Sequence, residues 1–223
     1  RVGGDARLST PALKEALLRG LCEGGAKAED LGLIPTPLLY YALSGGKADA
    51  GATVTASHNP PEYNGIKFFD AQGFKLPDAV EDEIEQFIAE GGLEGAVERV
   101  LKQGEEASMP AGALVGVAVE VEDACEMYID HVVNSIQAQG IDFSGLHVAL
   151  HTGHGASSLT SAEALRRLGA EVTVINDDFD GNDINVECGS THLGPLSELM
   201  VESGADVGIA HDGDADRVMM LAV

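Results

Sequence analysis

The chain has 223 residues, 44% of them hydrophobic, which is enough for one large domain or two ordinary domains with packed cores. Its 37 acidic residues against 13 basic ones give a formal net charge of -24, which would repel nucleic acids and anionic lipid surfaces. Neither is therefore expected as a partner. An acidic surface is also consistent with a high-salt cytoplasm, where salt screens the repulsion between carboxylates.

No apolar run approaches the length of a membrane span, and the first ten residues lack the charged and then apolar pattern of a signal peptide. The cysteines Cys22, Cys125 and Cys188 are far apart and outside any CxxC spacing, so neither a disulfide framework nor a zinc site is expected. These features favour a reducing cytoplasm as the location of the protein.

Strand-like and helix-like segments alternate along the chain, as in α/β proteins with largely parallel sheets. Ser9 or Thr10 can cap a first helix, which has Pro11 in its first turn and ends at Gly24-Gly25. Residues 50–55 are small and apolar, which predicts a buried strand. A further helix is expected from about residue 80 to residue 91, with an apolar face opposite its carboxylates. That apolar face is formed by Ile84, Phe87 and Ile88.

A domain boundary is expected between residues 91 and 122, where the hydrophobic periodicity weakens and Pro110 breaks any helix. We place the first domain at residues 1–108, a linker at residues 109–124 and the second domain at residues 125–223.

The second domain has the pattern of a βαβ unit. Residues 146–150, 171–175 and 206–210 predict buried strands, and residues 161–168 predict a helix between the first two strands. Ligand groups usually lie at the carboxyl ends of such strands. The sequence therefore predicts two consecutive α/β domains with mixed, largely parallel sheets.

Ser57 follows a predicted strand in the segment TASHNPP, where the Asn-Pro-Pro sequence favours a stiff turn. A serine is a weak nucleophile unless its surroundings activate it or it already carries the group to be transferred. His58 can hydrogen-bond a phosphate or carry a proton, and Lys67 can neutralise phosphate or, with a depressed pKa, accept a hydroxyl proton. Taken one by one, these three are also ordinary turn and surface residues.

Asp212, Asp214 and Asp216 follow another predicted strand and are separated by single small residues. They offer three hard oxygen ligands suited to Mg²⁺, although an acidic surface turn is the alternative. An EF-hand counted from Asp212 would need Gly and Glu where Arg217 and Val223 stand, so that motif is excluded. Arg217 can instead bind phosphate or sugar oxygens in a fork.

Together, these segments resemble the α-D-phosphohexomutases, a family that includes phosphoglucosamine mutases and phosphomannomutase/phosphoglucomutases. The likeness begins with GDARLS at residues 4–9 and IPTP at residues 34–37, and continues through TASHNP and NGIKFF to DGDADR. It covers nearly the whole chain. The TASHNP and DGDADR motifs, in this order and this far apart, are highly specific to the family.

The resemblance implies that Ser57 is the phosphoserine of the resting enzyme and that the three aspartates bind Mg²⁺ together with its phosphate. It further implies that Arg7 and His58 support the phosphoryl group, that Lys67 is a general acid or base, and that Arg217 holds the substrate. In this cycle phosphoserine gives its phosphoryl group to a sugar monophosphate. The bisphosphate then reorients, and its other phosphate returns to Ser57. The implied partner is a sugar phosphate, and the oligomeric state is left open.

The sequence departs from the family in three ways. Residues 151–156 read HTGHGA where the family often has a DCANGA-like turn, so His151 and His154 are either structural turn residues or a metal pair. His211 stands where an aromatic or apolar residue usually precedes the aspartates. The family also has four domains, so the chain is expected to begin inside the first domain and stop after the aspartates. It is not expected to complete catalysis alone.

Residues 64–75 and 184–196 look most like phosphoglucosamine mutases, and residues 33–43 look equally like phosphomannomutase/phosphoglucomutases. The expected reaction is the interconversion of glucosamine 6-phosphate and glucosamine 1-phosphate. A phosphomannomutase/phosphoglucomutase is the alternative activity, and two rival functions of other kinds stay open. One is an aspartyl-phosphate phosphatase, because a strand followed by Asp-x-Asp also presents such a nucleophile. The other is a non-catalytic module that binds a metal or a sugar phosphate.

Overall fold

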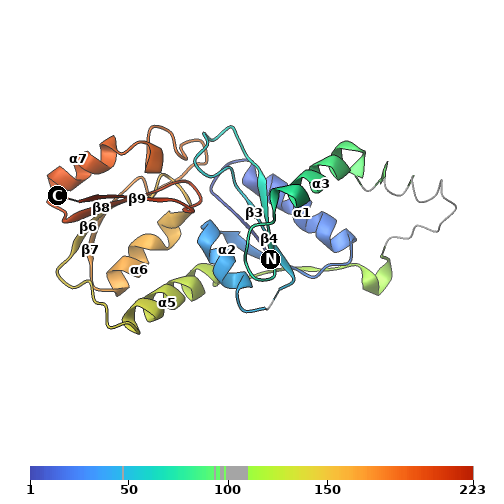
Figure 1. The fold of residues 1–223 in the computed structure, drawn as a ribbon, viewed down its shortest axis with the longest axis horizontal. Coiled ribbons are helices and arrows are strands. Elements are labelled where there is room, and N and C mark those ends of the chain that lie inside the picture. Colours follow the sequence, from blue (N-terminus) through green and yellow to red (C-terminus); the bar gives the residue numbers. More distant parts are fainter. Residues whose placement is uncertain (47, 93, 96–97, 99–109, 223) are drawn as a thin grey trace.

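The structure is a computed structural model that describes residues 1–46, 48–92, 94–95, 98 and 110–222 (Figure 1). It contains two sheets of mainly parallel strands, and each has one antiparallel pair among its named strands. This confirms the expected fold class of two consecutive α/β units with mixed, largely parallel sheets. Within the described ranges, no helix has the length and apolarity needed to cross a membrane.

The first sheet has five strands in the order β4-β3-β1-β2-β5. Small residues in β3 let α2 pack closely, because a Cβ atom at Gly51 would lie 2.5 Å from Leu43 Cδ1. The elements of this half are β1 (Val2–Gly4), α1 (Thr10–Glu23), β2 (Ala28–Leu33), α2 (Thr36–Leu43), β3 (Ala50–Val54), β4 (Ile66–Asp70), α3 (Asp78–Ala89), the 3₁₀ turn η1 (Gly112–Leu114) and β5 (Ala118–Glu120).

The second sheet has four strands in the order β7-β6-β8-β9. Its central strand β6 is buried and pairs in parallel with both neighbours, as the sequence predicts for an apolar run inside a βαβ unit. The elements of this half are α5 (Ala124–Gln137), β6 (His147–His151), the 3₁₀ turn η2 (Ala156–Leu159), α6 (Ser161–Arg167), β7 (Glu171–Ile175), the 3₁₀ turn η3 (Gly189–Thr191), α7 (Gly194–Ser203), β8 (Val207–His211) and β9 (Val218–Ala222).

Helix α5 joins the cores of the two halves. Its first residue, Ala124, belongs to the buried cluster under α2, and Ile129 and Val133 belong to the buried cluster with α6. Figure 1 shows α5 running beside α6 and reaching towards α2. Because one helix is packed into both cores, the carboxyl ends of the two sheets are held in a fixed relation.

The first helix begins where the sequence predicts, but not with the expected cap. Ser9 is the residue before the helix, yet no side-chain hydrogen bond caps the helix there. Asn64 donates to the hydroxyl oxygens of both Ser9 and Thr10 instead, at 2.8 and 3.0 Å. These hydroxyls therefore anchor the segment before β4, and Pro11 in the first turn reduces the number of N–H groups that need a cap.

Helix α3 starts at Asp78, close to the predicted position, and buries no side chain among the described residues. Two residues of its predicted apolar face are exposed, Phe87 at 42% and Ile88 at 66%, while Ile84 is half-buried. The division at residue 108 lies outside the described residues. Strand β5 falls within the segment expected to be a linker and pairs in parallel with β2, so part of that segment extends the first sheet.

Candidate active site

The site lies where the segments after β3 and β8 meet. Ser57 is in the loop of residues 55–63, here called the Ser57 loop, and is 7% exposed. Its φ of +52° is uncommon for a residue other than glycine, so the surrounding contacts must hold this conformation. The Ser57 N–H donates to Thr55 Oγ1 at 2.9 Å, and Thr55 Oγ1 donates to Asp5 Oδ2 at 2.7 Å. These two hydrogen bonds tie the Ser57 backbone to the buried Asp5.

Arg7 lies beneath the Ser57 loop and is 1% exposed. One N–H donates to Asp5 Oδ2, and the other four donate to backbone carbonyl oxygens of the loop at 2.5 to 3.1 Å. Those carbonyls belong to Ser57, Asn59, Pro60 and Tyr63. All five donors of the guanidinium are thus engaged. Arg7 supports the loop from behind, and its guanidinium is not free to face the Ser57 hydroxyl.

Asp212, Asp214 and Asp216 lie in the loop of residues 212–217 after β8, here called the aspartate loop. One carboxylate oxygen of each lies within 4.8 Å of the others, and no other such group is found in the described part of the chain. Burial raises the pKa of Asp212 to about 6, and the neighbouring Asp214 contributes to this rise. Asp214 Oδ1 is buried and has no hydrogen-bond partner among the described residues. An orphaned oxygen within three crowded carboxylates fits a divalent cation such as Mg²⁺.

The structure brings the serine and the aspartates together. Ser57 Oγ lies 2.6 Å from Asp212 Oδ2 and 3.1 Å from Asp216 Oδ1, and its single proton can serve one of them at a time. These contacts join two loops from different sheets. A group carried on Ser57 Oγ would therefore lie beside the carboxylates.

Lys67, on β4, forms the side of the site. Its Nζ lies 2.8 Å from Asp214 Oδ2 and 2.8 Å from Asp216 Oδ2. Burial lowers the pKa of Lys67, but the two carboxylates together raise it by more, so the net pKa is above its usual value. In this arrangement Lys67 is a charged ammonium, and the depressed pKa that a general base would need is not present.

His58 follows Ser57 in the chain, and Arg217 follows Asp216. His58 is half-buried, and its Nδ1 is enclosed without a hydrogen-bond partner in the described ranges. The Arg217 side chain is 52% exposed, with Nε 3.9 Å from Asp216 Oδ1, while its backbone N–H donates to Asp212 Oδ1. The Arg217 side chain is thus available to a ligand that enters beside Ser57, whereas His58 Nδ1 is shielded from solvent.

Two further residues complete the site, and the sequence pattern assigned no role to either. Thr36, at the start of α2, donates from Oγ1 to Asp214 Oδ2 at 2.9 Å and from its N–H to the Asp214 carbonyl at 2.8 Å. Asn185 donates from Nδ2 to the carbonyls of Ser57 and Asn59 at 2.8 and 3.1 Å. The sequence did contain an indication for Thr36, because it lies between two prolines at a helix start and helix N-termini favour anions. Asn185 stands in an irregular segment and gave no comparable signal.

The ring nitrogens of His151 and His154 are engaged by groups of the surrounding chain. His151 is fully buried, with Nδ1 accepting from the Gly153 N–H at 3.1 Å and Nε2 3.2 Å from the Gly189 nitrogen. His154 is bonded to the Asp178 carbonyl through Nδ1 at 2.6 Å. Both therefore stabilise the turn after β6, in agreement with the structural interpretation of this segment.

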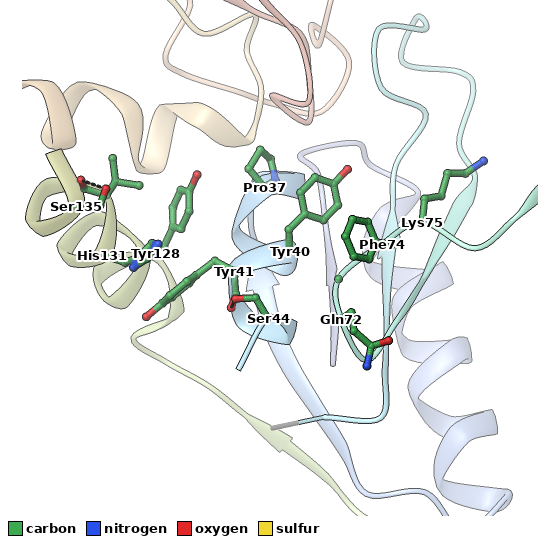
Figure 2. Close-up of a pocket in the computed structure, with 12 residues that line it drawn as sticks. Pro37, Tyr40, Tyr41, Ser44, Gln72, Phe74, Lys75, Tyr128, His131 and Ser135 are labelled. Carbon is green, nitrogen blue, oxygen red and sulfur yellow. Dashed lines mark hydrogen bonds between the residues drawn. The ribbon is translucent and has the colours of Figure 1, made fainter. Parts of the chain in front are cut away.

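An open cavity of about 670 Å³ lies between α2, α5 and the turn after β4. Figure 2 shows Tyr40 and Lys75 on one side and Tyr41, Tyr128 and His131 on the other. Burial raises the pKa of Tyr40, and the charges of Lys67 and of the aspartates act on it as well. Tyr40 therefore links the cavity to the edge of the aspartate cluster.

Comparison with known proteins places the two halves in one family. The family model for phosphoglucomutase/phosphomannomutase alpha/beta/alpha domain I matches residues 1–94, and the model for domain II matches residues 126–222. The phosphoglucosamine mutase of Ruminiclostridium cellulolyticum is 44% identical over 218 residues, which cover 98% of this chain and 45% of that protein. The phosphoglucosamine mutase of Clostridium acetobutylicum is 45% identical with the same coverage.

Solved structures agree with this result. The crystal structure of a putative phosphomannomutase from Thermus thermophilus matches with a TM-score of 0.76 and 31% identity, covering 99% of this chain and 47% of that one. The chain spans less than half the length of these relatives. It belongs to the phosphoglucomutase/phosphomannomutase family, of which it contains domains I and II.

Proposed function

We propose that the protein containing this chain is a phosphohexomutase that interconverts glucosamine 6-phosphate and glucosamine 1-phosphate. The observation that carries the proposal is the contact between Ser57 Oγ and Asp212 Oδ2, which puts a nucleophilic hydroxyl beside three carboxylates from the other sheet. The identities of 44% and 45% to phosphoglucosamine mutases favour a hexosamine phosphate as substrate.

In this proposal Ser57 carries the phosphoryl group in the resting enzyme. The carboxylates of Asp212, Asp214 and Asp216 would hold Mg²⁺, which when bound supplies positive charge to the phosphoryl oxygens. Lys67 is a charged ammonium at the edge of the cluster and neutralises phosphate charge in the same place. Catalysis of phosphoryl transfer needs mainly positioning and charge neutralisation, and these groups provide both.

The remaining residues act around the transferred group. His58 follows Ser57 in the chain and can hydrogen-bond a phosphoryl oxygen, and the exposed guanidinium of Arg217 can hold substrate oxygens through two N–H groups at once. Phosphoserine at position 57 gives its phosphoryl group to the hydroxyl of a hexosamine monophosphate. The bisphosphate reorients and returns its other phosphate to Ser57. We assign Arg7 to holding the loop, because its five donors are already bonded.

One labelling experiment distinguishes the proposed mutase from the two rival functions, an aspartyl-phosphate phosphatase and a non-catalytic binding module. The whole protein is incubated with ³²P-labelled sugar phosphate, and the labelled peptide is mapped together with its intact mass. Label on Ser57 that disappears in the Ser57→Ala variant supports the mutase. Label on Asp212 or Asp214 would indicate an aspartyl-phosphate phosphatase, and no label in an otherwise folded protein would indicate a non-catalytic binding module.

The substrate is tested separately on the whole protein. Initial rates are compared on glucosamine 6-phosphate, mannose 6-phosphate and glucose 6-phosphate at equal concentration. The proposal expects the highest kcat/KM on glucosamine 6-phosphate. A clear preference for mannose 6-phosphate or glucose 6-phosphate would favour a phosphomannomutase/phosphoglucomutase, in line with the similarity to the Thermus thermophilus protein.

A further inference from the structure

The Ser57 loop is held through its backbone carbonyl groups by donors from both halves of the molecule. The carbonyls of Ser57 and Asn59 accept from Arg7 Nη2 at 2.9 and 2.8 Å. The same two carbonyls accept from Asn185 Nδ2 at 2.8 and 3.1 Å. Arg7 belongs to the first sheet unit and Asn185 to the second. Asn185 is therefore the counterpart of Arg7 across the boundary between the two units.

Asn185 also lies against the aspartate loop. A Cβ atom placed on Gly213, between Asp212 and Asp214, would lie only 2.9 Å from Asn185 Nδ2. The Asn185 N–H donates to the carbonyl of Gly153 at 3.1 Å, which ties the residue to the turn after β6. One buried side chain thus touches the loop that carries Ser57 and the loop that carries the aspartates.

The backbone of Asn185 explains why asparagine stands there. Its φ is +61°, a left-handed conformation that asparagine adopts more readily than most residues with a side chain. Asparagine also supplies two N–H donors on one nitrogen, and both are used on carbonyl oxygens. Aspartate would fit the same backbone but would bring a negative charge to two carbonyl oxygens. Glycine would fit the backbone and leave both carbonyls without the second donor.

We propose that Asn185 is a positioning residue that holds the Ser57 hydroxyl in place beside the three aspartates. Its catalytic consequence rests on the proposed function, while its effect on the loop does not. Ser57 is in a strained left-handed conformation 2.6 Å from Asp212 Oδ2, so a small rotation of the loop would separate the two oxygens. Because Arg7 remains in place without Asn185, the loop would stay folded but lose its alignment to the second unit.

The test uses the whole protein and three variants. Asn185→Asp and Asn185→Gly remove the donors without opposing the left-handed backbone, and the second adds no charge. Asn182→Asp is the matched control, because Asn182 lies in the same segment with an exposed side chain. Hydrogen exchange is measured at the Ser57 and Asn59 amides, which donate to Thr55 Oγ1 and the Ala56 carbonyl. The steady-state kcat and KM are measured alongside the melting temperature.

We expect both Asn185 variants to exchange faster in the Ser57 loop by about tenfold or more, with β6 amides unchanged. The value of kcat should fall by about 10- to 100-fold while KM changes less than about threefold, because misplacing a reacting group acts on the chemical step. The melting temperature should stay within about 5 °C of wild type. Asn182→Asp should leave all values unchanged.

Unchanged loop exchange in both Asn185 variants would overturn the proposal. So would a loss of activity that tracks only a large fall in melting temperature, because that would mark a purely structural residue. If the wild type is inactive on sugar phosphates but the Asn185 variants still loosen the loop, the proposed function fails and the positioning role stands. Faster exchange together with a kcat loss at constant KM supports both.

Discussion

Ser57 Oγ and Asp212 Oδ2 lie 2.6 Å apart although 155 positions separate the two residues. Each residue follows the carboxyl end of a parallel strand, Ser57 after β3 in the first sheet and Asp212 after β8 in the second. The site therefore exists only when both units are folded and docked. Helix α5, which is packed into both cores, supplies the docking.

Replacing Asp214 with asparagine should weaken divalent-cation binding while keeping the shape of the loop. Asp214 is 1% exposed, with one oxygen bonded to Thr36 and Lys67 and the other without a partner in the described chain. Removing one charge from the cluster should weaken Mg²⁺ affinity at least about tenfold, as ligand charge sets affinity for hard cations. Loss of charge stabilisation should lower kcat by about 100-fold or more.

Calorimetric titration of the whole protein with MgCl₂ and rate measurements check this prediction. The matched control is Asp177→Asn, which removes the same charge from an exposed position. Chelation by EDTA should abolish the wild-type activity, and added MgCl₂ should restore it. Equal Mg²⁺ affinity in the Asp214→Asn variant and the wild type would argue against a cation site in the aspartate loop.

Replacing Arg7 with alanine should destabilise the first unit severely. The change removes five hydrogen bonds and leaves the buried carboxylate of Asp5 without its cation. Breaking such a buried pair costs ~3–5 kcal/mol of unfolding free energy. Arg7→Lys should fall between wild type and alanine, since an ammonium has three donors and no planar fork.

Urea unfolding followed by hydrogen exchange of β1 and β3 amides measures this cost. Arg19→Ala is the control, because the Arg19 side chain is 71% exposed and its ion pair with Glu23 is 4.0 Å long. If Arg7→Ala left these amides as protected as in Arg19→Ala, the loop-holding role of Arg7 would be refuted.

The sequence predicted the fold, the Ser57 loop and the aspartate loop, because all three depend on local patterns. Apolar runs placed β3, β6, β7 and β8 within one or two residues, and the motif around Ser57 and the aspartate triad named groups that the structure brings into contact. The contacts of Arg7 could not be predicted from spacing. Which way its guanidinium points depends on the fold of a loop whose Ser57 carbonyl lies 50 positions further along the chain.

Asn185 was missed for a similar reason. Its proposed role depends on a left-handed backbone and on two carbonyls of the other unit. Neither feature produces a periodic pattern in the sequence. The exposed face of α3 shows the opposite case, since helical spacing placed Phe87 and Ile88 on one face but could not show whether anything covers it.

Salt should stabilise the protein. The formal net charge of -24 produces repulsion across the surface, and added ions screen it, with a Debye length of about 3 Å at 1 M against about 10 Å at 0.1 M. The urea midpoint should therefore rise between 0.1 and 1 M KCl. Mg²⁺ is held constant in excess so that cation binding to the aspartate loop does not contribute. No rise in the midpoint would remove the support for a high-salt habitat.

Stability should fall as the pH drops from about 6.5 to about 4, in part because of His151. Burial lowers the pKa of His151 from 6.5 to about 4, and the neighbouring His154 contributes to this fall. Between these values His151 binds a proton in the unfolded chain but not in the folded chain, so the free energy of unfolding decreases as pH falls. The contribution of His151 changes no further below about pH 4. At ~1.4 kcal/mol per unit, the full effect is ~3 kcal/mol of unfolding free energy.

Hydrogen exchange of β6 amides between pH 4 and 7 measures the local unfolding free energy. His151→Asn should flatten the slope, because its amide oxygen can accept one of the backbone N–H groups and does not titrate. Part of the slope should remain, since burial also lowers the pKa of His211. The exposed His192, replaced by asparagine, is the control and should leave the slope unchanged. An equal slope in wild type and His151→Asn would show that folding does not lower the pKa of this imidazole.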